Sequence, residues 1–202
     1  GHWQSLSVSF KPIAYGAGMC WGADENHNVN IRKVMNEFVF LDENNIAADC
    51  FYDLGNAYKV PDIDLHNSSI ISRLLVHYDY DLTDEPVNTL TVQKLKKTIN
   101  YIKKITERFE SAKLDSSQAD LIKDEFEQTT RLMIHGCELG IARLKTEGHK
   151  TADIDKKTRK KLAGKMKKII KNQKKLWLQR NRPGGLDDSL AQMQKLLETY
   201  SQ

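Results

Sequence analysis

Residues 174–200 read KKLWLQRNRPGGLDDSLAQMQKLLETY and carry the clearest structural signal in the chain. The stretch predicts two helices joined by a tight corner, because Pro183, Gly184 and Gly185 end a helix and permit a sharp turn. The second helix is expected to start at Asp187, whose carboxylate can accept hydrogen bonds from the free amides of the first turn. The apolar positions that would pack these helices are Trp177, Leu178, Leu186, Leu190, Met193, Leu196 and Leu197. The corner itself, for which we predict a structural role, consists of Trp177, Arg180, Arg182, Pro183, Gly184, Gly185 and Asp187.

Apolar residues recur at three- and four-residue spacing along most of the remaining chain, which is typical of amphipathic helices. We expect helices over residues 3–21, 31–40, 44–60, 70–79, 91–112, 117–148 and 153–181. The first is predicted to be buried, because it is rich in alanine and glycine, with Pro12 in its first turn or at a kink. Gly136 and Gly140 mark a place where another helix can approach closely. No segment shows the alternating pattern of a strand, so the predicted fold class is all-α, a bundle of long antiparallel helices.

The starts of several helices have side chains suited to N-capping. The candidates are Asn30 for the second helix, Asp42 or Asn44 for the third, Ser68 or Ser69 for the fourth, and Asp153 or Asp155 for the last long one.

Charge divides the chain into unlike halves. Residues 1–90 carry 5 Lys/Arg and 13 Asp/Glu, whereas residues 91–202 carry 26 Lys/Arg and 14 Asp/Glu. The halves should attract each other. We therefore expect an end segment over 1–27, an acidic region of short helices over 28–90 and a basic bundle of long helices over 91–202, with 28–202 forming one helical domain.

Composition argues for a soluble protein, since 29% of the residues are charged and the mean hydropathy is -0.57. No apolar run is long enough to span a bilayer, so we expect no membrane partner. The chain begins without Met, and we treat it as a fragment of something longer. Cys20, Cys50 and Cys137 are odd in number and widely spaced, which favours free, buried thiols and a cytoplasmic location.

The strongest candidate for nucleic-acid binding is the run from Lys150 to Lys175, which contains 12 Lys/Arg and two acids. On a helix its apolar residues share one side, so the lysines form a solvated face. The run has a single arginine, Arg159, and no interleaved aromatic residues. Nucleic-acid binding is therefore the least favoured function, and we expect no nucleic-acid partner.

The sequence contains no arrangement typical of a metal or catalytic site. His135 and Cys137 are two residues apart, so on a helix they point in different directions and would not share a metal. A partly buried histidine beside a buried thiol explains them better. Arg180 and Arg182 are expected to bind helix-end carbonyls or acids of the first half rather than a ligand. We predict no catalytic residue, no metal and no cofactor.

Three stretches carry a resemblance to a known family: GHWQSLSVSFKPIAYGAGMCWGADEN at residues 1–26, FYDLGNAY at 51–58 and LWLQRNRPGGLDDSLAQM at 176–193. Together they look like the C-terminal part of bacterial family 20 glycoside hydrolases, the β-N-acetylhexosaminidases. In such relatives the first stretch resembles the last strand and last helix of a catalytic (β/α)₈ barrel. The rest resembles a helical domain appended to that barrel.

The resemblance implies that this chain lacks the catalytic residues of the family. The family hydrolyses terminal N-acetylhexosamine residues with an Asp-Glu pair on an earlier barrel strand, where the Glu is the general acid and the Asp steadies the substrate's acetamido group. That pair would lie upstream of Gly1, so the chain alone would be inactive. Its implied partners are the missing barrel and, in the complete enzyme only, an N-acetylhexosamine-containing glycan. His2 and Trp3 would approach the rim of the substrate pocket.

Two other functions remain open. A stand-alone helical module could bind a partner protein or form a homo-oligomer through an exposed helix face. A nucleic-acid-binding basic helix is the third candidate.

Overall fold

The computed structural model describes residues 5–201, and every regular element in that range is helical. The α-helices are α1 (Phe10–Trp21), α2 (Ala23–Asn26), α3 (Ile31–Val34), α4 (Ala47–Gly55), α5 (Ile70–Val76), α6 (Val92–Phe109), α7 (Ala119–Arg143), α8 (Lys156–Arg180) and α9 (Leu186–Thr199). A 3-10 turn, η1 (Leu6–Ser9), precedes α1, and a π-helix, η2 (Met35–Phe40), continues α3. The described residues contain no strand, and one isolated bridge pairs Asp42 with Leu114. The prediction of an all-α fold is confirmed.

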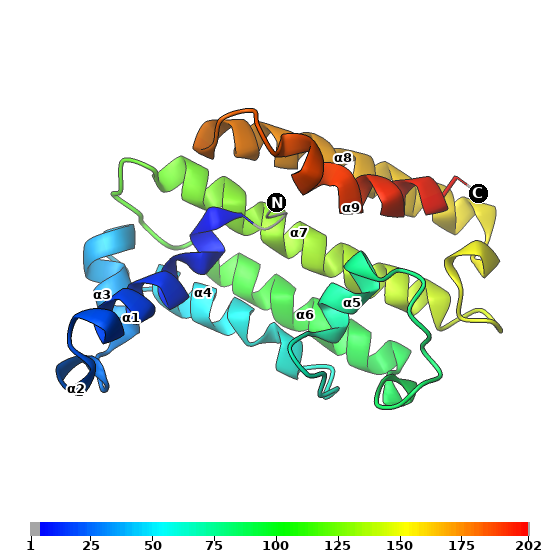
Figure 1. Cartoon of the computed structure of the whole chain (residues 1–202), viewed down its shortest axis with the longest axis horizontal. Coiled ribbons are helices and arrows are strands. Elements are labelled where there is room, and N and C mark those ends of the chain that lie inside the picture. The colour runs from blue at the N-terminus through cyan, green and yellow to red at the C-terminus, as the bar shows by residue number, and fades with distance from the viewer. Residues whose placement is uncertain (1–4, 202) are drawn as a thin grey trace.

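The long helix α7 lies at the centre of the molecule (Figure 1). α6, α8 and α5 all pack against it, while α9 packs on α8 and α4 on α6. The helices α6, α7, α8 and α9 run up and down in alternation, and the short helices α1 to α3 gather at one end (Figure 1).

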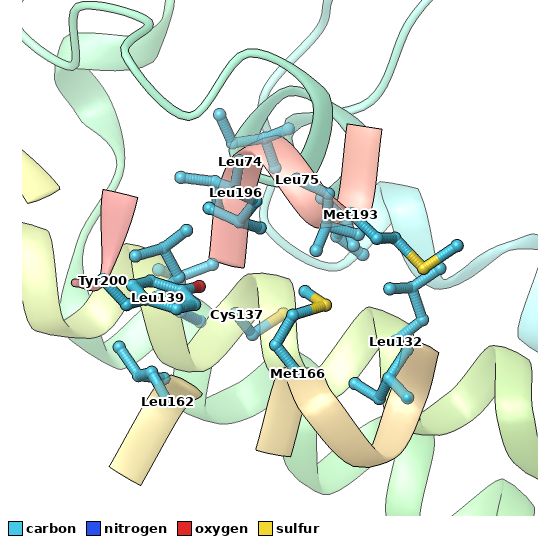
Figure 2. Packing of buried hydrophobic residues seen from close by; sticks show 14 of the residues in the cluster. Leu74, Leu75, Leu132, Cys137, Leu139, Leu162, Met166, Met193, Leu196 and Tyr200 are labelled. Carbon is cyan, nitrogen blue, oxygen red and sulfur yellow. The ribbon is translucent and has the colours of Figure 1, made fainter. Parts of the chain in front are cut away.

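Two clusters of buried apolar side chains form the core. One is aromatic and joins η2, α4, α6 and α7, with the ring centroids of Phe109 and Phe126 4.0 Å apart and those of Phe51 and Phe126 4.9 Å apart. The other is largely aliphatic and joins α5, α7, α8 and α9 (Figure 2). α7 contributes to both clusters, so it connects the two parts of the core.

The predicted close approach at the two glycines of α7 is confirmed. A Cβ atom on Gly136 would lie 3.0 Å from Leu75 Cγ and 3.1 Å from the carbonyl oxygen of Ile71, both in α5. A Cβ atom on Gly140 would lie 2.8 Å from a methyl carbon of Leu74. α5 therefore crosses α7 at a distance that only glycine permits without repacking.

Replacing Gly136 by alanine is expected to lower the free energy of unfolding by about 1–2 kcal/mol, because the added methyl group overpacks the contact with α5. The matched control is Gly164→Ala in α8, where a Cβ atom would meet nothing within 4 Å. That control should raise the free energy by up to about 1 kcal/mol through helix propensity alone. Urea denaturation measures both, and equal stabilisation by the two substitutions would contradict the close approach.

Several predicted helix starts are confirmed. The side chains of Asn30, Ser69 and Asp155 accept hydrogen bonds from backbone amides in the first turns of α3, α5 and α8. Pro12 lies in the first turn of α1. Backbone amides in a first turn have no acceptor within the helix, so the lack of an N–H group on proline costs no hydrogen bond there.

Asp42 fixes the turn before α4. Its buried carboxylate accepts backbone hydrogen bonds from Asn44, Ile46, Ala47 and Lys113, at 3.2, 2.6, 2.7 and 2.8 Å. Burial acts to raise the pKa of Asp42, but these hydrogen bonds to the charged form outweigh it, and the pKa is lowered. The carboxylate also joins the start of α4 to the segment after α6.

Three predictions about burial and capping are wrong. α1 contains no buried residue, and Trp21 at its end is 93% exposed. Cys20 is exposed, unlike Cys50 and Cys137, although all three thiols are free. The last helix begins at Leu186 instead of Asp187, because Gly185 adopts φ +83° and acts as the N-cap, and Asp187 makes no side-chain cap.

Candidate functional site

The exposed side of α1 consists of uncharged residues. Exposed positions there are Pro12, Ile13, Tyr15, Gly16, Ala17, Cys20 and Trp21, which we call the α1 face. None of these residues is charged, whereas 29% of the whole chain is. Ile13 is 56% exposed, so an aliphatic side chain that would ordinarily be buried faces solvent.

The opposite side of α1 holds the helix on the body of the protein. Phe10 and Ala14 pack against the aromatic cluster, and the ammonium group of Lys11 lies 3.7 Å from the ring centroid of Tyr52. The amide of Asn26 donates a 2.8 Å hydrogen bond to the carbonyl of Gly18. Because Lys11, the one charged residue of α1, is used in this attachment, the α1 face remains apolar.

The chemistry of the α1 face suits docking. Its side chains are apolar or small, with one phenol and one thiol. A Cβ atom on Gly16 would meet nothing within 4 Å, so a second helix or sheet could lie close against the backbone there. An exposed helix face without charged residues is therefore a candidate interaction surface.

A buried ion pair joins the end of α8, next to the corner with α9, to α7. Arg180 donates from Nε to Oε1 of Glu125 at 3.0 Å and from Nη2 to Oε2 at 2.8 Å, and it also bonds Gln118. The two charged side chains are only 9% and 2% exposed. Arg180 was expected to bind helix-end carbonyls or an acid of the first half, but the acid that it binds, Glu125, lies in α7.

The other corner residues complete the turn. The indole nitrogen of Trp177 donates to the carbonyl of Arg182 at 3.2 Å, and its ring lies 3.7 Å from where a Cβ atom of Gly185 would be. Trp177 is half-buried, and Arg182, Pro183, Gly184 and Asp187 are exposed. Leu178 is 46% exposed, so its predicted role in packing the two helices is wrong.

The sequence analysis did not identify Glu125 as the buried partner of Arg180, since an acid in a long charged helix ordinarily faces solvent. The available signal was its position, three residues after Ile122 and directly before Phe126, both of which are buried. The predicted substrate-rim residues His2 and Trp3 lie outside the described residues.

Cys137 is buried, as predicted, and His135 is more deeply buried than the partly buried position predicted for it. His135 is 1% exposed, and its Nε2 atom lies 2.8 Å from the hydroxyl of Tyr200 at the end of α9. Burial raises the pKa of Cys137 to about 12, so its thiol is unreactive near neutral pH. Among residues 5–201, no group of three or more His, Cys, Asp or Glu side chains could hold a metal ion.

The basic run forms the exposed side of α8, as its apolar spacing predicts. Leu162, Met166, Ile169 and Leu176 are buried on the other side. Lys165 pairs with Glu138 at 2.5 Å, and Lys175 lies 3.3 Å from Asp124.

A groove of about 520 Å³ lies where η1, α4, α5, α7 and α8 meet. Its apolar walls are formed by Phe51, Leu54, Ile71, Leu75, Leu132 and Met133. The groove thus lies along the boundary between the two core clusters. None of its lining residues is charged, in contrast to a larger cleft of about 1010 Å³ between the ends of α7 and α8, which is lined by Lys145, Lys150, Glu147 and Asp153.

Comparison with family models, with curated proteins and with solved structures gives no match to this chain. In the part of the chain that the structure describes, no helix combines the length and the apolar character needed to cross a membrane.

Proposed function

We propose that this chain is the non-catalytic, helical C-terminal portion of a family 20-like β-N-acetylhexosaminidase, and that the α1 face docks against the upstream (β/α)₈ barrel of that enzyme. The observation that carries the proposal is the α1 face itself. A helix that exposes Ile13 and Trp21 while directing its one charge inward has the pattern of a helix between two layers. The last helix of a barrel has one side on the barrel and another available to an appended domain.

In this proposal, the chain supports the barrel structurally and contributes no catalytic residue. The resemblance places the Asp-Glu pair that hydrolyses N-acetylhexosaminides on an earlier strand, outside residues 1–202. The helical body, fixed by the corner and by α7, would hold α1 at a constant position beneath the barrel. The chain would therefore affect catalysis indirectly, by stabilising the barrel.

The activity test compares this chain with a protein extended upstream through a full barrel from the same source DNA. Release of p-nitrophenol from p-nitrophenyl N-acetyl-β-glucosaminide is expected from the extended protein and not from the chain alone. Activity in neither protein would remove the assignment to a hexosaminidase.

A substitution in the α1 face tests the docking directly. Ile13→Asp is expected to destabilise the extended protein by about 2–4 kcal/mol, since it places an unpaired charge in an apolar interface. The same change in the chain alone should alter stability by less than about 0.5 kcal/mol, because Ile13 faces solvent there. The control is Leu178→Asp, which changes an exposed aliphatic residue of α8 and should be tolerated in both proteins. Thermal unfolding measures all four variants.

The second candidate function, an interaction module that forms a homo-oligomer, rests on the same surface. It predicts that the chain alone self-associates at micromolar concentration and that Ile13→Asp restores the monomer, as measured by analytical ultracentrifugation. If the extended protein is monomeric and inactive while the chain alone forms a specific dimer, the module takes the place of the hexosaminidase assignment.

A further inference from the structure

We propose that the exposed lysines of α8 form a binding surface for an extended, single-chain anionic polysaccharide. The surface, which we call the lysine face, consists of the nine exposed lysines between Lys156 and Lys175. They lie on the side of the helix opposite to the buried Leu162, Met166 and Ile169. This inference goes beyond the proposed function and does not depend on it, because the lysine face and the α1 face share no residue.

The charge of the lysine face is almost entirely uncompensated within the described protein. α8 contains no Asp or Glu, and among residues 5–201 the one lysine of the face that forms an ion pair is Lys175, 3.3 Å from Asp124. Four pairs of these lysines are spaced four residues apart, as Lys167 and Lys171 are, and like charges at that spacing destabilise a helix. The first two residues of α8 are also lysines, at the end of the helix where the dipole disfavours positive charge. An anionic partner would relieve both effects.

The surroundings of the lysine face limit the width of that partner. The face follows one side of one helix for about 28 Å, since each residue advances an α-helix by about 1.5 Å. α7 and α9 pack against α8 (Figure 1), and both carry exposed acids. In α7, Asp124 and Glu127 line a small cleft together with Lys175, and in α9, Asp187 and Asp188 are exposed. A bilayer or a nucleic-acid duplex would meet these acids as well as the lysines, whereas a single extended chain along α8 would avoid them.

The side chains of the lysine face indicate the chemistry of that chain. The exposed positions between Lys156 and Lys175 are lysines and Gly164, without an aromatic, aliphatic or arginine side chain. Single-stranded nucleic acids are held largely by stacking of their bases on aromatic rings, which this face lacks. A polysaccharide with carboxylate or sulfate groups presents negative charges along an extended chain and has no bases to stack. Clusters of lysine are typical of surfaces that bind such polyanions.

The test titrates the whole chain into a fluorescently labelled oligogalacturonate, a carboxylated oligosaccharide, and follows its anisotropy. We expect binding that weakens steeply as the salt concentration rises, because the contacts are exposed ion pairs. A labelled neutral dextran oligomer should not bind. Oligodeoxythymidylate, which carries both charge and bases, should bind more weakly than the oligogalacturonate at the same salt concentration, because the face offers its bases no aromatic ring.

Two double variants with equal changes in net charge locate the contact. Lys167→Glu with Lys171→Glu on α8 is expected to weaken binding about tenfold, as the reversal of two exposed ion pairs would. The matched control, Lys96→Glu with Lys103→Glu, changes two exposed lysines of α6, on the other side of α7 (Figure 1). It should weaken binding by less than about threefold, through net charge alone.

A charge-conserving variant separates charge from folding. Lys167→Arg with Lys171→Arg should bind like the unmodified chain, and all of these variants should fold, because the side chains are exposed. The proposal is overturned if the oligogalacturonate does not bind, if the α6 variant loses as much affinity as the α8 variant, or if oligodeoxythymidylate binds more tightly.

Discussion

Glu125→Gln is expected to lower the free energy of unfolding by about 3 kcal/mol, because it leaves the buried guanidinium of Arg180 without its counter-charge. The substitution keeps the size of the side chain, so the loss reports charge and hydrogen bonding instead of a cavity. Urea denaturation at neutral pH measures it.

The matched control lies two residues further along α7. Glu127 pairs with Arg131, but these side chains are 49% and 52% exposed, so Glu127→Gln should cost less than about 1 kcal/mol. The double substitution Glu125→Leu with Arg180→Met should recover most of the stability, since replacing both members of a buried pair with apolar residues is often close to neutral. Equal losses at Glu125 and Glu127 would show that the corner does not depend on a buried charge.

The second large effect is a loss of stability in mild acid. Burial, assisted by the positive charge of Lys165, lowers the pKa of His135 from 6.5 to about 4. Because the unfolded chain takes up the proton first, the contribution of neutral His135 is complete above pH 6.5 and is lost as the pH falls from 6.5 to 4. The shift corresponds to about 3 kcal/mol.

Protonation would place a second donor on a buried ring whose Nδ1 atom has no partner among the described residues. The ring lies beside the Tyr200 hydroxyl and within the influence of the positive charge of Lys165. His135→Gln, which can still bond the Tyr200 hydroxyl, should lose this part of the pH dependence, as followed by thermal unfolding between pH 7 and pH 4. His66→Gln, at an exposed position, should retain it. A His135→Gln profile as steep as that of the unmodified chain would contradict the buried, neutral histidine.

Features set by neighbouring residues were predictable from the sequence. The helical period and the caps at Asn30, Ser69 and Asp155 each depend on a few consecutive side chains, and their geometry is fixed once the helix forms. The close approach at Gly136 and Gly140 was predictable in its position, because the missing side chains mark it, but the sequence did not identify α5 as the partner.

Features set by distant segments were not predictable. α1 was expected in the core because small residues favour close packing. Whether a helix is buried also depends on another part of the protein covering it, and the sequence of the helix alone does not show this. The partner of Arg180 lies 55 positions away on another helix. The groove combines residues from η1, α4, the turn at Tyr58, α5, α7 and α8, which are far apart in the sequence.

The central position of α7 has a consequence for how the chain unfolds. Its first half supplies Ile122 and Phe126 to the aromatic cluster, and its second half supplies Leu132 and Leu139 to the aliphatic one. Neither cluster can melt without removing a wall of the other, so we expect them to unfold in a single calorimetric transition. α1 has no buried residue, and it should exchange its amide hydrogens by local opening well before that transition.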